Sequence, residues 1–88
     1  MDTRARIAWN LRHHRSRLGV TQENLAVDAD VDRTVISDIE RGKHNASVDL
    51  LDRIAGALDI DVALLLAEPD PGDARPKPLK PGRKAVKR

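Results

Sequence analysis

Residues that start and stop helices divide most of this chain into short segments. The first segment, residues 3–17, places apolar side chains on one face of a 3.6-residue period, at Ile7, Leu11 and the adjoining Leu18. Gly19 then favours a left-handed stop, and Thr21 favours the N-cap of a second helix. Helices this short are marginal alone in water, so they have to be stabilised by packing against one another.

Four further helices are expected, over residues 22–29, 32–41, 47–58 and 61–67. Asp32 and Ser47 are the predicted N-caps of the third and fourth helices, and Gly42 is the predicted end of the third. The fourth helix has an apolar stripe at Val48, Leu51, Ile54, Ala55 and Leu58. No segment alternates with a period of two for long enough to predict a strand. The predicted fold is therefore all-α and compact, with five helices.

The composition limits the class of protein further. The 88 residues suffice for one small domain, and Trp9 is the single aromatic residue, so the core has to be aliphatic. The absence of cysteine excludes a disulfide scaffold and suits a reducing cytoplasm, where we expect the protein to act. No apolar run approaches the roughly 20 residues of a membrane span, and the N-terminal residues do not resemble a signal peptide.

Charge is distributed unevenly along the chain. Residues 1–68 hold 9 Lys/Arg against 12 Asp/Glu, whereas residues 69–88 hold 7 against 2 and contain all five prolines. The second stretch has too few apolar groups to form a core, so residues 3–68 are the predicted domain and 69–88 a disordered basic tail. This tail would add phosphate affinity or merely solubility. The net negative domain means that any argument for nucleic acid has to come from the placement of side chains.

The third predicted helix has two different faces. At about 100° per residue, one side carries Val35, Ile36 and Ile39, and the other carries Arg33, Thr34, Ser37, Asp38 and Arg41. A solvated face is the simplest interpretation. However, a short turn from the preceding helix is the helix-turn-helix format, in which the second helix enters the DNA major groove. Gln22 begins the preceding helix, where its amide would touch a phosphate or brace the next helix, and Asn45 follows in a loop.

The stretch "GVTQENLAVDADVDRTVISDIERGKHNASVDLLDRIAGALDI" resembles the phage-repressor-type (Xre family) DNA-binding domain, which is lambda-repressor-like. The matching pieces are "LR..R..LG", "TQ..LA", "DRT.IS.IERG" and "N.S...L..IA.AL", over about residues 5–66. The part "DRT.IS.IER...N" is similar to controller proteins of restriction–modification operons. The resemblance implies that Arg33, Thr34 and Asp38 read bases, and that the DNA backbone is contacted by Gln22, Ser37, Arg41, His44 and Asn45. Arg33 would be bidentate to guanine.

The sequence departs from the family pattern at three positions. Ala46 replaces a common proline, and Val35 stands where an aromatic side chain is frequent. His14 occupies a usually apolar core position, where a buried neutral imidazole is favoured over a pH-sensing role. His13 and His14 point about 100° apart on a helix, so a metal site is not expected.

Arg15 and Glu40 both lie on otherwise apolar helix faces, which predicts a buried ion pair between the first and third helices. The family has such a pair at the matching positions.

Apolar residues also suggest a contact surface near the end of the domain. The run "VALLLAEP" has more apolar groups than one buried face of a short helix needs, so it predicts either deep packing or a homodimer interface at Val62, Leu65 and Leu66. Trp9 covers the rim of the core or is exposed to a partner.

These observations predict a dimeric, sequence-specific regulator of double-stranded DNA, acting as a repressor or autoregulator without a cofactor. No nucleophile has a base at convincing spacing, so an enzyme is not expected. The alternative is an antitoxin-like or adaptor protein that binds a partner protein through Trp9 and residues 62–66, with DNA binding secondary.

Overall fold

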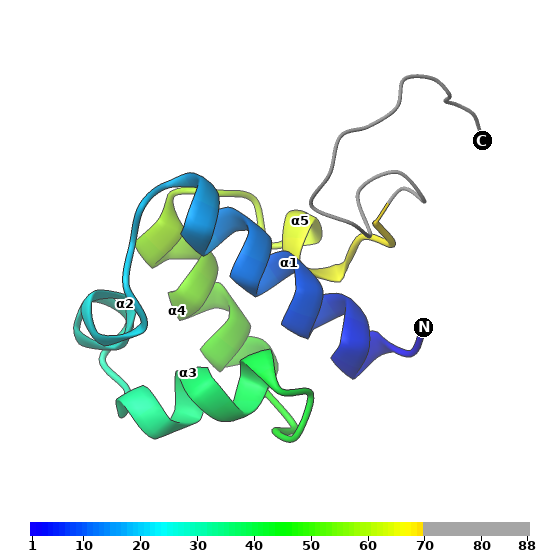
Figure 1. Ribbon diagram of the computed structural model, residues 1–88, viewed down its shortest axis with the longest axis horizontal. Helices are drawn as coiled ribbons and strands as arrows, with labels where there is room; N and C mark the ends of the chain where they lie inside the picture. The colour runs from blue at the N-terminus through cyan, green and yellow to red at the C-terminus, as the bar shows by residue number, and fades with distance from the viewer. Residues whose placement is uncertain (70–88) are drawn as a thin grey trace.

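The computed structural model describes residues 1–69, which form five helices around one core (Figure 1). The helices are α1 (Thr3–Arg17), α2 (Gln22–Ala29), α3 (Arg33–Glu40), α4 (Val48–Leu58) and α5 (Ala63–Leu66). α2 packs against α3 and α4, while α1 packs against α3 and α5. The described residues contain no strand, and the predicted all-α, five-helix fold is confirmed.

Local signals set most of the helix ends. The hydroxyls of Thr21 and Ser47 accept hydrogen bonds from the backbone three residues later, as their N-cap positions predict. Gly19 and Gly42 have φ of 71° and 73°, the left-handed conformation expected at those helix ends. Asp30 and Asp59 also adopt left-handed φ and end α2 and α4, because a short polar side chain tolerates this conformation.

The third helix starts differently from its neighbours. Asp32 occupies the N-cap position of α3, but its side chain makes no capping hydrogen bond. The helix covers residues 33–40, so Arg41 lies just beyond its last turn.

The core is aliphatic, as the composition predicts. Its fully buried large side chains come from all five helices: Leu11, Leu25, Ile36, Ile39, Ile54 and Leu65. Two residues assigned to apolar stripes prove to be exposed. Leu18 is 43% exposed because it follows the last turn of α1, where the chain turns away at Gly19. Val48 is 75% exposed in the first turn of α4, and Leu50 is buried instead.

The last helix is shorter than the predicted 61–67. α5 is a single turn over residues 63–66, and the carboxylate of Asp61 accepts a hydrogen bond from the Ala63 amide at its start. Asn10, a buried side chain of α1, donates to the carbonyl oxygens of Leu65 (3.0 Å) and Ala67 (2.7 Å). These two bonds satisfy carbonyls that a one-turn helix leaves unpaired, and they fix α5 against α1.

His14 is half-buried on α1 rather than fully buried as expected, because it lies beside the exposed His13 and Arg17. Arg17 lies with Nη2 3.1 Å from Nδ1 of His14. A guanidinium only donates, so this contact requires an unprotonated Nδ1. Burial, with the charges of His13 and Arg17, lowers the pKa of His14, which agrees with a neutral ring.

A buried ion pair joins α1 to α3. Arg15 donates to Glu40 through Nε (2.6 Å to Oε2) and Nη2 (3.0 Å to Oε1), and its Nη1 donates to the Val20 carbonyl (3.0 Å). The hydrogen bond to Glu40 raises the pKa of Arg15, against the effect of burial. Arg12, also on α1, donates to the Glu40 backbone oxygen at 2.7 Å. The last residue of α3 is therefore held to α1 through both its side chain and its backbone.

Residues 70–88 lie outside the part that the structure describes, and so does most of the predicted basic tail. Within residues 1–69, no helix has the length and apolar character needed to cross a bilayer.

We predict that Asn10→Ala lowers the free energy of unfolding by about 1–3 kcal/mol, because it leaves the buried carbonyl oxygen of Leu65 and the part-buried one of Ala67 unpaired. Urea unfolding followed by circular dichroism measures this loss. Asn24→Ala, at an exposed position of α2, is the matched control and is expected to change stability by less than about 0.5 kcal/mol. Equal losses of stability in the two variants would contradict the structural role of the Asn10 hydrogen bonds.

We predict that Glu40→Ala costs roughly 3–5 kcal/mol, because it strands the Arg15 guanidinium at a partly buried site. Replacing both partners by apolar residues, Arg15→Met with Glu40→Leu, is expected to cost much less. Glu68→Ala serves as the control, since it removes the carboxylate of the more exposed Arg6–Glu68 pair. Chemical denaturation of the three variants gives the ranking. A Glu40→Ala protein as stable as the control would refute the structural importance of the pair.

Candidate nucleic-acid interface

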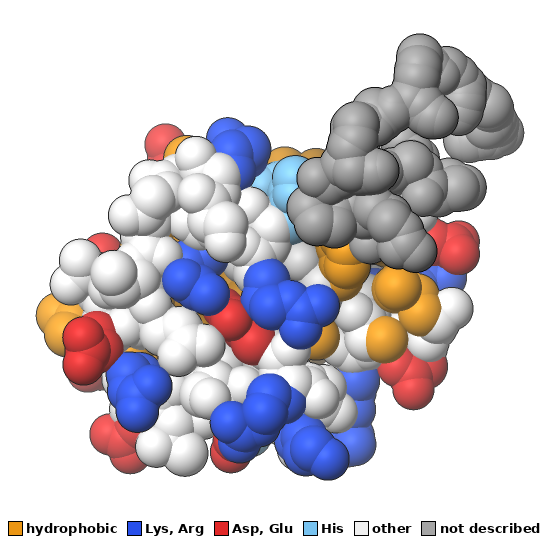
Figure 2. Space-filling model, viewed as in Figure 1, with side chains coloured by type: hydrophobic (Ala, Val, Ile, Leu, Met, Phe, Trp, Pro, Cys, Tyr) orange, Lys and Arg blue, Asp and Glu red, His pale blue; other side chains and the backbone are white. Residues whose placement is uncertain are grey.

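The polar face of α3 lies at the surface because its apolar face is anchored in the core. Ile36 and Ile39 are almost completely buried, whereas Arg33 and Thr34 are exposed in the first turn. Figure 2 shows Lys and Arg side chains gathered over α3 and the adjacent part of α1. This surface therefore combines positive charge with the first turn of a short, well-anchored helix.

Gln22 connects the buried ion pair with the start of α3. Its Nε2 donates to Oε1 of Glu40 at 3.1 Å, and its Oε1 accepts from Nη1 of Arg33 at 3.4 Å. The sequence left two roles open for Gln22, a phosphate contact or a brace for the next helix, and the structure shows the brace. A glutamine amide has two N–H groups, so one of them is still available for a phosphate.

The second half of the polar face is hydrogen-bonded internally, through the residue that follows α3. Arg41 donates from Nη1 to the Ser37 hydroxyl at 2.8 Å, and its Nη2 pairs with the carboxylate of Asp38. This pairing partly neutralises Asp38, which would otherwise repel nearby phosphates. His44 is half-exposed and Asn45 exposed in the loop after α3, so both are accessible beside the polar face.

The structure separates the three residues expected in a dimer interface. Leu65 is completely buried within its own chain, so the expectation of a Leu65 dimer contact is corrected: its side chain fills the core. Val62 is half-buried and packs against the same core. Leu66 is 39% exposed, and the neighbouring Leu64, which was not singled out, is 43% exposed.

Trp9 forms a second feature of α1. Its ring is half-buried and stacks on the exposed His13, with ring centroids 4.8 Å apart and an interplanar angle of 16°. Trp9 is thus partly buried, and the rest of its surface is accessible.

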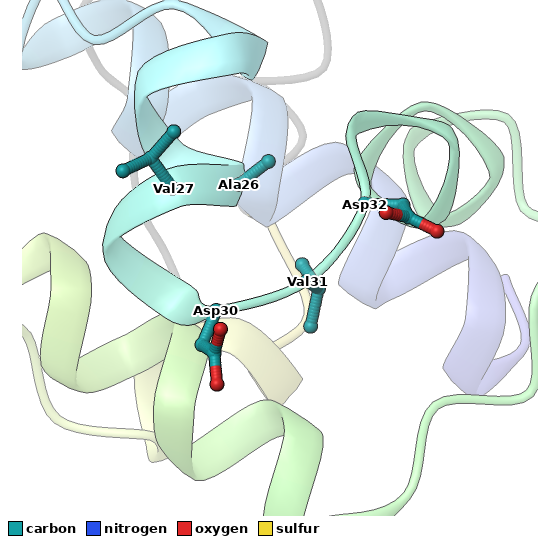
Figure 3. Close-up of a pocket in the computed structure, with 5 residues that line it drawn as sticks. All are labelled: Ala26, Val27, Asp30, Val31 and Asp32. Atoms are coloured by element: carbon teal, nitrogen blue, oxygen red, sulfur yellow. The ribbon is translucent and has the colours of Figure 1, made fainter.

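An open depression lies at the turn between α2 and α3 (Figure 3). Its lining consists of Ala26, Val27, Asp30, Val31 and Asp32. Figure 3 shows the carboxylates of Asp30 and Asp32 pointing in different directions. They do not converge on one point, so they form neither a general acid–base pair nor a set of cation ligands.

Sequence comparison matches residues 11–65 with the helix-turn-helix family (HTH_3). A protein described as a hypothetical transcription factor of Neisseria meningitidis is 37% identical over 68 residues, which cover 77% of this chain and 64% of that protein. Control protein C.BamHI of Bacillus amyloliquefaciens is 45% identical over 51 residues, covering 58% and 63%. The chain therefore spans slightly less than two thirds of the length of these relatives.

Solved structures give the same grouping. The crystal structure of the hypothetical transcription factor NHTF from Neisseria has a TM-score of 0.75 and 37% identity, covering 77% of this chain and 78% of that chain. The restriction–modification controller protein C.AhdI from Aeromonas hydrophila has a TM-score of 0.69 and 34% identity, covering 70% and 94%. The family match includes all of α2, α3 and α4, and therefore the whole polar face of α3. This chain belongs to the helix-turn-helix family, in its Xre-type branch.

Proposed function

We propose that the protein is a sequence-specific DNA-binding transcriptional regulator that reads the major groove with α3. The observation that carries this proposal is the orientation of α3, which buries Ile36 and Ile39 and leaves Arg33 and Thr34 exposed. Related proteins are described as a transcription factor, a control protein and an immunity repressor, which supports the same class. Residues 3–68 would form the DNA-binding domain, and the cytoplasm would be the compartment where it meets DNA.

The contacts divide into base reading and backbone binding. Arg33 would bind guanine O6 and N7, with Thr34 and Asp38 over neighbouring base edges. Side chains around this set would contact phosphates, namely Gln22, Ser37, Arg41, His44 and Asn45. Arg41 would bind its phosphate through the N–H groups that its bonds to Ser37 and Asp38 leave free, or by exchanging part of that pairing.

A homodimer would place two such helices on one DNA face, with half-sites about 34 Å apart. Leu64 and Leu66 support this arrangement, because both are exposed apolar side chains on the single turn of α5. Repression or autoregulation is the proposed mode of action. A relative that is 39% identical over 62 residues is described as the immunity repressor protein of a Bacillus phage, which supports this mode. The exposed part of Trp9 supports a second candidate function, a protein-binding adaptor that would use Trp9 and residues 62–66.

Selection of duplexes from a random pool is expected to enrich an inverted repeat. On the selected duplex, Arg33→Ala should abolish discrimination at one base pair per half-site, a loss of about 1–3 kcal/mol. Binding isotherms on duplexes with single base changes measure this loss. Arg53→Ala, an exposed arginine of α4 outside the proposed interface, is the matched control and should keep the discrimination.

One result would overturn the proposal. Without enrichment, binding that only weakens with salt would mean that α3 does not read sequence. The adaptor function would then take precedence, and Arg33→Ala would leave partner binding intact.

We predict that Leu66→Glu shifts the monomer–dimer equilibrium toward the monomer by about tenfold or more, since a carboxylate would be desolvated in the interface. Sedimentation equilibrium across a concentration series measures the change. Val27→Glu adds the same charge at an exposed apolar position of α2 and should leave the equilibrium unchanged. An unaltered dimer in Leu66→Glu would move the interface to another surface.

A further inference from the structure

We propose that the buried carboxylate of Glu40 controls base discrimination by Arg33, acting through the side-chain amide of Gln22. Glu40 is in this sense a positioning residue, since it lies at the opposite end of α3 from the base-reading arginine. The inference rests on the proposed function, in which Arg33 reads a base.

We call the chain of hydrogen bonds from Glu40 through Gln22 to Arg33 the relay. Its first member, Glu40, is held from several directions. Glu40 is 4% exposed and receives two hydrogen bonds from Arg15, while Arg12 donates to its backbone oxygen. Its Oε1 accepts from Arg15 at 3.0 Å and from Gln22 at 3.1 Å. The position of that oxygen is therefore fixed by the packing of α1 against α3.

The charge of Glu40 determines which end of the Gln22 amide faces inward. An ionised carboxylate only accepts hydrogen bonds, so it has to be met by the NH₂ group of Gln22. The carbonyl oxygen of the amide then faces away from Glu40. A neutral partner with both donors and acceptors would remove this constraint, because it could bind either end of the amide.

The exposed amide oxygen in turn selects the partner at the start of α3. Arg33 and Glu40 are seven residues apart, about 10 Å along the helix axis and within roughly 20° of each other around it. Glu40 thus lies at the edge of the apolar face next to Arg33, and the Gln22 amide is hydrogen-bonded to both side chains. The oxygen accepts from Nη1 of Arg33 at 3.4 Å, a long contact that uses one of five guanidinium N–H groups. The remaining donors are left for guanine, with the side chain already restricted in orientation.

Glu40→Gln tests the relay with little change in volume, and Gln22→Met removes the amide while keeping the length of the side chain. For each protein, the ratio of Kd values is measured between the selected duplex and a duplex changed at the base pair that Arg33 reads. We expect this ratio to fall roughly three- to tenfold in both variants, the range for one lost orienting hydrogen bond. Glu23→Gln removes an exposed carboxylate next to Gln22 and should leave the ratio unchanged.

Repeating both changes in the Arg33→Ala background separates positioning from stability. A relay through Arg33 predicts that neither change then alters the ratio, whereas a general loss of folding or phosphate contact would weaken binding to both duplexes in either background. If Glu40→Gln does not fold, Gln22→Met alone decides. An unchanged ratio in Gln22→Met or in a folded Glu40→Gln protein, or a fall that persists in the Arg33→Ala background, overturns the inference. If Arg33→Ala itself leaves discrimination intact, base reading by Arg33 is the part that fails.

Discussion

The ion pair between Arg15 and Glu40 determines where the rest of the site can lie. α3 has only eight residues and would not be stable alone, so its orientation depends on its contacts with α1 and α2. A buried pair is weak evidence for stability, since desolvation offsets much of the attraction between the charges. Its directional hydrogen bonds to two oxygens nevertheless allow only one placement of the end of α3. The pair is thus better understood as a device for orientation than for stability.

The polar face is largely hydrogen-bonded within the free protein. Arg41 is occupied by Ser37 and Asp38, and Arg33 by Gln22. In the proposed complex, any of these bonds that DNA replaced would lower the net gain from the new contact. In return, the long arginine side chains lose less conformational entropy on binding, because they are already restricted. In the proposed complex, a wrong base pair would offer no compensation for the bonds that it breaks, so this arrangement would favour specificity over affinity.

Local rules predicted the parts of this structure that depend on local chemistry. The capping hydroxyls, the glycine stops and the two faces of α3 follow from residues within one or two turns. The pairing of Arg15 with Glu40 was also predictable, because each charge stands alone on an apolar face. Asn10 was missed, since a polar residue inside a helix gives no sign of carbonyl partners 55 residues later. Leu18 and Val48 were misplaced because periodicity does not reveal where a neighbouring helix ends. For the same reason, periodicity did not predict that Leu65 is buried in the α5 turn while its neighbours are exposed.

The distribution of charge explains how a domain with excess acid can bind a polyanion. Residues 1–68 hold more Asp and Glu than Lys and Arg, so the domain as a whole is repelled by phosphate. α4 and the turn that follows contribute to this excess, with four aspartates between residues 49 and 61 against the single Arg53. The basic side chains instead gather over α1 and α3 (Figure 2). An encounter of DNA with the acidic face is therefore unfavourable, and in the proposed complex an encounter through α3 would bring arginines and the proposed reading helix to the groove together. In the proposed complex, charge would select the approach and the polar face of α3 would select the sequence, so weakening one should leave the other largely intact.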